Sequence, residues 1–116
     1  MYKTPISIEM LFLEAESVNL YEQLVLQLNK DFNLGNEPLD FPAAISSLEL
    51  KNQLHEKLYK LIQYKFDSYL SLLYIIDVSE AEIKKLDGSD VLQLSEQVCF
   101  LVLKREWQKV WFRNKY

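Results

Sequence analysis

The stretch Ser46–Asp77, SSLELKNQLHEKLYKLIQYKFDSYLSLLYIID, carries the clearest helical pattern of the sequence. It opens with a capping box, in which the Ser46 hydroxyl receives a free backbone N–H of the first turn and the Glu49 carboxylate reaches back to another. Apolar residues then recur at the spacing of one helix face: Leu50, Leu54, Leu58, Leu61, Ile62, Tyr69, Leu72, Leu73 and Ile76. The pattern predicts a single helix that ends near Asp77 and is about 45 Å long.

A second helical pattern precedes this stretch. Thr4 and Pro5 are typical of a helix start, with a hydroxyl N-cap followed by proline. We expect an amphipathic helix that continues to about Asn33 and stops at Gly35, and Ser17 offers an alternative, separate start. Its seven heptad positions, all apolar except Glu14, are Leu11, Glu14, Val18, Tyr21, Val25, Leu28 and Phe32.

The remaining sequence predicts one short helix and one long helix. A second capping box, Ser79–Glu82, opens the short helix, which ends at Gly88. The last helix begins near Ser89 or Asp90 and runs to about Asn114.

Three long helices and one short helix predict an all-α fold, an antiparallel helical bundle. We expect a single domain over residues 1–116. One long connection, residues 34–46, leaves the order and handedness of the helices open.

The composition excludes several classes of protein. A chain with 49% apolar and 13% aromatic residues is not disordered, and two glycines are too few for an ordinary β-sandwich. No apolar run approaches the ~20 residues of a membrane span. The N-terminal residues lack the clean apolar stretch of a signal peptide. One cysteine requires no oxidising compartment, so we expect a cytoplasmic protein.

The single histidine and single cysteine exclude the common catalytic and metal sites. A zinc protease helix needs a second histidine four residues after His55, where the chain has Tyr59, and a di-metal bundle needs two Glu-x-x-His motifs. Cys99 stands in an apolar run and is expected to be a small buried residue, whereas His55 flanks the apolar stripe. We therefore expect no catalytic residue, cofactor or metal, and no enzyme activity.

The last helix carries two apolar lines instead of one. The first contains Val91, Leu94, Val98 and Val102. The second line, rotated by roughly 100° or more from the first, is the candidate interface and contains Phe100, Leu103, Trp107 and Trp111. Three explanations for the two lines are open: a central helix with wide burial, a helix that packs against a second copy, or a helix end that presents aromatics to another partner.

Charge is segregated along the chain. Residues 104–116 hold five basic residues and one acid, a net charge of +4, whereas the rest holds eight basic and sixteen acidic residues, a net charge of −8. The basic residues could contact nucleic-acid phosphates or an anionic membrane surface, complement the dipole of their own helix, or pair with the acidic part of the same or a second chain. These candidate anion or partner contacts are Lys104, Arg105, Lys109, Arg113 and Lys115.

The segment Tyr69–Glu80, YLSLLYIIDVSE, resembles a segment of small, uncharacterised helical proteins from bacteria of the Bacteroidetes group. The resemblance covers about a tenth of the chain and implies a structural signature, a helix end that leads into the next capped helix. It implies no activity and no functional residue. We expect Asp77 and Ser79 to bond free N–H groups of the following helix.

These observations predict a non-catalytic helical interaction or scaffold module that forms a homodimer through its C-terminal helix. A first alternative is a small nucleic-acid-associated factor that uses the basic aromatic end. A second alternative is a small-ligand-binding protein with a pocket between His55 and four tyrosines, which are Tyr59, Tyr64, Tyr69 and Tyr74.

Overall fold

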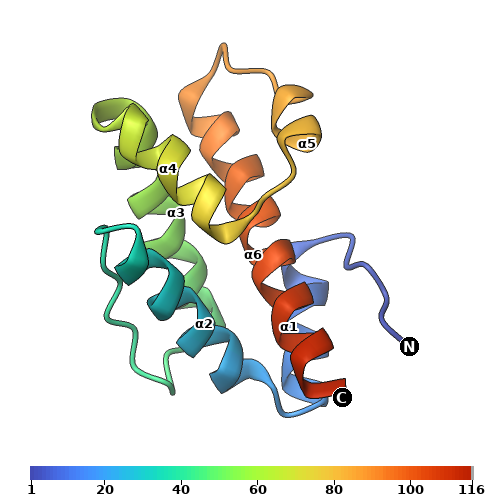
Figure 1. Cartoon of the computed structure of the whole chain (residues 1–116). Coiled ribbons are helices and arrows are strands. Elements are labelled where there is room, and N and C mark those ends of the chain that lie inside the picture. The colour runs from blue at the N-terminus through green and yellow to red at the C-terminus, as the bar shows by residue number, and fades with distance from the viewer. Residues whose placement is uncertain (116) are drawn as a thin grey trace.

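The structure, a computed structural model, describes residues 1–115, which form six helices and no strand (Figure 1). The prediction of an all-α fold is therefore confirmed. Tyr116, the last residue of the expected domain, lies outside the described residues. The helices are α1 (Ile8–Ser17), α2 (Tyr21–Leu34), α3 (Ser47–Tyr64), α4 (Phe66–Ile76), α5 (Glu80–Lys84) and α6 (Val91–Lys115).

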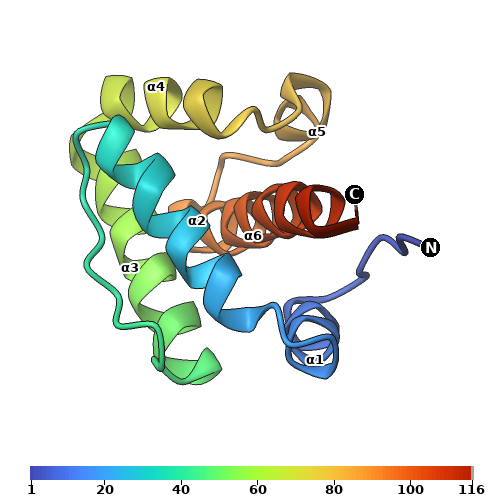
Figure 2. The same ribbon diagram turned by 60° about the horizontal axis from the view of Figure 1, so that its bottom comes forward.

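The 25-residue α6 is the centre of the fold. It packs against α1, α2, α3 and α4, and Figure 2, in which α6 crosses the middle of the molecule, shows α4 above it and α1 below it. This is the central helix that the first of the three explanations required, and it accounts for both apolar lines. Its buried side chains are Ser95, Val98, Cys99, Leu101, Val102, Leu103, Glu106, Trp107 and Val110.

The expected N-terminal helix is divided into α1 and α2, so its prediction as one helix was wrong. Asn19 adopts a left-handed conformation with φ 59°, and the Leu20 N–H donates to the Ala15 carbonyl at 2.8 Å, which closes the end of α1. The helix start also differs, because Ser7 and not Thr4 is the N-cap of α1. The turn lets α1 and α2 each pack against α6.

The expected helix from Ser46 to Asp77 is also two helices. The backbone of Lys65 leaves the helical region, with φ −139° and ψ 59°, and separates α3 from α4. Because of this break α4 packs against α2, α3 and α6 together. A straight continuation would carry the apolar side of α4 away from the core. The fold is therefore one long helix among five shorter ones, not a bundle of three long helices.

Glu37, in the long connection between α2 and α3, forms ion pairs with α3 and with the break at Lys65. Its side chain is 8% exposed and pairs with Lys57 at 3.1 Å and with Lys65 at 3.2 Å. Burial alone would raise the pKa of Glu37, but the two ammonium groups lower it below its ordinary value. The connection, α3 and the residue that separates α3 from α4 are thus joined by one buried carboxylate.

The helix starts follow the capping predictions. The Ser46 hydroxyl accepts from the Glu49 N–H, the Ser79 hydroxyl accepts from the Glu82 N–H, and α6 begins beside Asp90, whose carboxylate accepts from two N–H groups of its first turn. No helix within residues 1–115 is both long and apolar enough to cross a lipid bilayer.

Gly35 matters for packing and not for a left-handed turn. Its φ is −84°, and the positive φ at the end of α2 belongs to Asn36. A Cβ at Gly35 would lie 3.0 Å from Leu72 Cδ1 and 3.5 Å from Ile75 Cδ1. The absence of a side chain therefore allows α4 to approach the end of α2.

We predict that Trp107→Ala lowers the free energy of unfolding by about 3–5 kcal/mol, because Trp107 is fully buried in the core and its removal leaves a large cavity. Leu92→Ala, at an exposed position of the same helix, is the control and should change it by less than about 0.5 kcal/mol. Urea denaturation measures both values. Equal effects of the two substitutions would contradict the central position of α6.

Candidate functional site: a charged cleft and an apolar groove at the α4–α5 junction

The junction between α4 and α5 separates two hollows of the surface. Asp77 ends α4 in a left-handed conformation with φ 70°, and the N–H groups of Asp77 and Val78 both donate to the Leu73 carbonyl. The chain then turns through Val78 to Ser79, the cap of α5. Residues 77–79 consequently form a wall with one hollow on each side.

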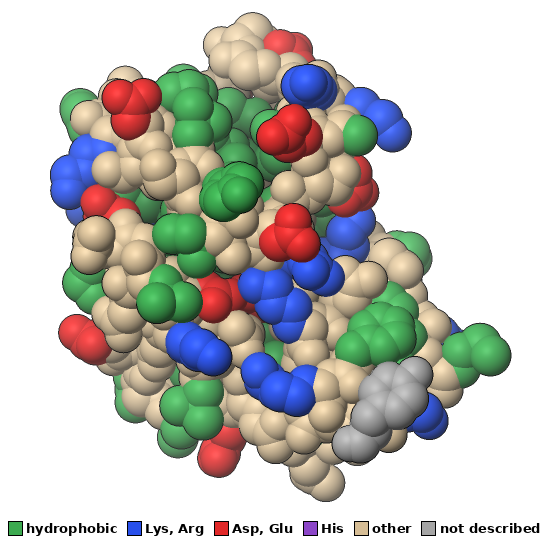
Figure 3. Space-filling model, viewed as in Figure 1, with side chains coloured by type: hydrophobic (Ala, Val, Ile, Leu, Met, Phe, Trp, Pro, Cys, Tyr) green, Lys and Arg blue, Asp and Glu red, His purple; other side chains and the backbone are tan. Residues whose placement is uncertain are grey.

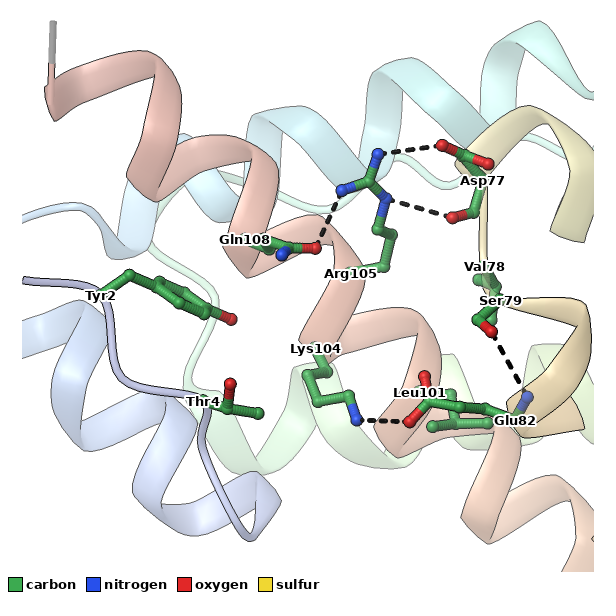
Figure 4. A pocket seen from close by; sticks show the side chains of 10 residues that line it. All are labelled: Tyr2, Thr4, Asp77, Val78, Ser79, Glu82, Leu101, Lys104, Arg105 and Gln108. Carbon is green, nitrogen blue, oxygen red and sulfur yellow. Dashed lines mark hydrogen bonds and ion pairs between the residues drawn. The ribbon is translucent and has the colours of Figure 1, made fainter. Parts of the chain in front are cut away.

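The first hollow, which we call the α5–α6 cleft, has a volume of about 590 Å³. Figure 4 shows its walls, which come from the N-terminal segment, the α4–α5 junction with α5, and α6. Its lining side chains are mostly polar or charged: Tyr2, Thr4, Asp77, Val78, Ser79, Glu82, Leu101, Lys104, Arg105 and Gln108.

In this cleft, two ion pairs join α6 to Asp77 at the α4–α5 junction and to Glu82 on α5. Arg105 donates from Nε to the Asp77 carbonyl at 3.1 Å and from Nη2 to Asp77 Oδ2 at 3.0 Å, and its Nη1 donates to Gln108 Oε1 at 2.8 Å. Lys104 Nζ donates to Glu82 Oε1 at 3.0 Å. Because each cation has a carboxylate partner, the cleft has no net charge while the two pairs are ionised.

The second hollow, the α4–α5 groove, lies on the other side of the junction and has a volume of about 690 Å³. It is mostly apolar, because its floor and sides contain Leu70, Leu73, Tyr74, Val78 and Ile83. Figure 3 shows hydrophobic side chains gathered over the α4 region, whereas Lys and Arg side chains gather over the second half of α6.

Beside the groove, α4 presents an apolar line to solvent, which we call the α4 ridge. Phe66, Leu70 and Tyr74 follow one another at intervals of four residues and are 51%, 47% and 85% exposed. The opposite side of α4 is also apolar, because Tyr69, Leu72 and the other core residues of this helix are buried. A helix that is apolar on both sides normally has partners on both sides.

The expected interface on α6 is corrected by this structure. Leu103 and Trp107 are fully buried inside the chain, so they are core residues and not surface contacts. Phe100 and Trp111 are half-buried, and the Trp111 ring packs against Tyr2, with ring centres 5.4 Å apart. The four residues therefore do not form a continuous outer face of α6.

The basic residues of α6 are engaged within the chain, as one of the alternatives proposed. Besides the two pairs in the cleft, Lys109 Nζ donates to Asp31 Oδ2 at 2.8 Å, and Arg113 Nη1 donates to Gln27 Oε1 at 2.7 Å. Lys115 Nζ lies over the Trp111 ring, 5.6 Å from its centre. The basic end of the sequence thus neutralises part of the acidic remainder.

A buried pair of carboxyl groups lies next to Lys109. Glu106 is fully buried beside Asp31, and Lys109 Nζ is 3.0 Å from Glu106 Oε1, although neither Glu106 oxygen receives a well-directed hydrogen bond. Burial and the neighbouring Asp31 raise the pKa of Glu106 to about 9, so it is protonated at neutral pH. For Asp31, burial would raise the pKa, but the neighbouring Glu106 carboxyl group and the hydrogen bonds from Lys109 and Gln27 lower it overall.

His55 makes a structural contact that the sequence did not predict. Its Nε2 lies 2.7 Å from the hydroxyl of the buried Ser95, which donates its proton to the Leu92 carbonyl at 2.8 Å. The hydroxyl has one proton, so the His55 Nε2–H donates to it. Cys99 is buried as expected, and burial raises the pKa of its thiol to about 12. Neither arrangement provides an activated nucleophile.

A pocket between His55 and the tyrosines is not observed. The hollow beside His55 has a volume of about 430 Å³ and no tyrosine in its lining, which includes Lys51, Asn52, Glu96 and Cys99. The four tyrosines are divided between α3, which holds Tyr59 and Tyr64, and α4, which holds Tyr69 and Tyr74. Among residues 1–115, no three His, Cys, Asp or Glu side chains form a group that could hold a metal ion.

The sequence patterns predict neither the buried carboxyl pair nor the contact of Asp77 with α6. One signal for Glu106 was present, because it stands four residues after Val102 and four before Val110 on a buried line. Asp77 was expected to bond the next helix, but only Ser79 does so, while Asp77 binds Arg105. That pair joins residues 28 positions apart, and no local pattern encodes it.

Comparison with protein families, with curated proteins and with solved structures finds no match.

We predict that the Glu106→Gln variant is more stable than the native chain, by a difference in the free energy of unfolding that grows as the pH rises. The folded chain retains a proton on Glu106 up to about pH 9, whereas an unfolded chain releases it near its ordinary pKa of 4.5. Stability from this group is therefore fully present below pH 4.5 and is lost as the pH rises toward 9, by up to about 1.4 kcal/mol per pH unit. Glutamine stays neutral and avoids this loss.

Urea denaturation between pH 5.5 and 8.5 measures the effect. Glu96→Gln, the same substitution at an exposed position of α6, is the matched control. A difference between Glu106→Gln and the native chain that is constant with pH would contradict a protonated Glu106.

Proposed function

We propose that this chain is a non-catalytic helical interaction module that forms a homodimer, with the α4 ridge of each copy seated in the α4–α5 groove of the other. The observation that carries the proposal is the position of a convex apolar ridge directly beside a concave apolar groove. This surface replaces the α6 face on which the sequence-based expectation of a dimer rested.

The shape of this surface favours a second copy over an unrelated partner. A two-fold dimer requires one patch that is complementary to itself, so a ridge and a groove must lie side by side on the same face. Leu70 and Tyr74 belong to both features, because they line the groove and also stand on the ridge. A helix with apolar residues at intervals of four is also the usual occupant of an apolar groove.

The charges at the edge of the groove also suit a symmetric contact. Glu80 and Lys84 line its α5 side, and neither forms an ion pair with another described residue. A two-fold arrangement can place Lys84 of one copy near Glu80 of the other. Such rim pairs select the orientation of the partner more than they add affinity.

A non-catalytic role is supported by the state of the reactive side chains. The Ser95 hydroxyl and the Cys99 thiol are buried in the core, and the His55 ring is held by Ser95. A buried cysteine without a partner cysteine needs no oxidising compartment, which supports a cytoplasmic location. Nucleic-acid association has less support, because Lys104, Arg105 and Lys109 already have carboxylate partners.

We predict that the native chain is a dimer and that Leu70→Glu makes it a monomer without loss of helix content. The new carboxylate would lie between two apolar surfaces, where burial of a charge is unfavourable. Size-exclusion chromatography with light scattering gives the mass, and circular dichroism gives the helix content. Leu26→Glu, at an exposed leucine of α2 away from the groove, is the matched control and should stay dimeric.

A native chain that remains a monomer at high micromolar concentration would refute the proposal. Equal dissociation by Leu26→Glu would place the interface elsewhere and would also refute it.

A further inference from the structure

We propose that the α5–α6 cleft binds a small zwitterion of the α-amino-acid class, with its carboxylate on Lys104 and Arg105 and its ammonium group on Asp77 and Glu82. This inference is independent of the homodimer, because the cleft lies on the opposite side of the junction from the α4–α5 groove.

The arrangement of charge is the first argument. Figure 4 shows the Arg105–Asp77 and Lys104–Glu82 pairs on either side of Val78 and Ser79, with Tyr2 and Thr4 across the cleft. Two cations and two carboxylates therefore line one hollow. A simple anion would be attracted by the cations but repelled by the carboxylates, and a simple cation would meet the reverse. A molecule with both charges matches both pairs.

Unused hydrogen-bonding capacity is the second argument. Asp77 accepts through Oδ2 and Glu82 through Oε1, so their other carboxylate oxygens have no partner among the described residues. Lys104 has three N–H donors, of which one is engaged with Glu82. Both signs of charge thus retain free positions, and a zwitterion can bind without breaking either internal ion pair.

Neutral donors on the cleft wall form a third argument. Gln108 uses its amide oxygen for Arg105 and Ser79 uses its hydroxyl as an acceptor, so the Gln108 NH₂ group and the Ser79 hydroxyl proton have no partner in the described part of the chain. The hydroxyl groups of Tyr2 and Thr4 also have no partner among residues 1–115. These donors favour a ligand whose acidic end is a carboxylate, because a carboxylate accepts several hydrogen bonds at once.

The size and the apolar part of the cleft limit the ligand to a small molecule with a side chain. A volume of about 590 Å³ lies within the usual range for small-molecule sites, ~300–1,000 Å³. Val78 and Leu101 supply apolar surface between the polar groups. An aliphatic amino acid therefore suits both the charges and the wall.

The test compares L-leucine with two molecules that each lack one charge. 4-Methylpentanoate has the same skeleton without the amine, and 3-methylbutylamine has it without the carboxylate. Titration of the ¹⁵N-labelled chain by NMR, at constant ionic strength, follows the amides of Ser79, Lys104, Arg105 and Gln108. We expect saturable shifts with leucine at millimolar concentration and affinity at least about tenfold weaker for each half-molecule.

Two variants and one control locate the site. Lys104→Met removes one partner of the ligand carboxylate and should weaken leucine binding at least about tenfold. Thr4→Val removes only a hydroxyl at an exposed position outside the helices and should weaken it about fivefold, which keeps the test valid if Lys104→Met lowers stability. Lys51→Met, beside the separate His55 hollow, should leave binding unchanged.

Three results would overturn the proposal. They are the absence of saturable shifts with leucine, equal affinity for leucine and either half-molecule, and unchanged leucine affinity in both Lys104→Met and Thr4→Val. None of these measurements depends on the oligomeric state, so failure of this inference is distinguishable from failure of the proposed dimer.

Discussion

Burial of the middle of α6 sets the arrangement of the helices that surround it. Leu103 and Trp107 are fully enclosed, so the surrounding helices must cover this helix on several sides within a short length of chain. Helices that continued without interruption would extend beyond α6 and leave their own apolar faces in water. The chain turns at Asn19 and Lys65 for this reason, and the pieces on either side of each turn pack on α6 or on one another.

The same burial requires partners for the charges of α6. Lys104, Arg105 and Lys109 project from a central helix, and carboxylates on α5, at the α4–α5 junction and on α2 receive them. Glu106 is the exception, because it is buried beside another carboxyl group and remains neutral by keeping its proton. Segregation of basic and acidic residues along the chain thus becomes pairing across the fold, which is why the net charge of the last thirteen residues is a poor guide to an external anion.

Two surface features remain after these internal demands are met. One is α4, whose outer side exposes Phe66, Leu70 and Tyr74 and borders a groove. The other is the cleft on the far side of residues 77–79, in which ion pairs are satisfied but donors and carboxylate oxygens remain free. Both depend on the left-handed Asp77, because its turn separates α5 from α4 and directs the Asp77 carboxylate toward Arg105. A proposed protein contact and a proposed ligand site therefore share one short wall.

Periodicity and capping patterns predict the helical content, the caps at Ser46 and Ser79, and the buried sides of α2, α3 and α4. Each of these depends on residues a few positions apart, which such patterns record directly. The packing of the helices decides where the two long patterns break, which aromatic residues of α6 are core, and which carboxylate each cation meets. Lys109 and Asp31 are separated by 78 positions, so their contact exists only after α2 and α6 have packed together. The α5–α6 cleft likewise joins residues 2–4, 77–82 and 101–108, and no local pattern could reveal it.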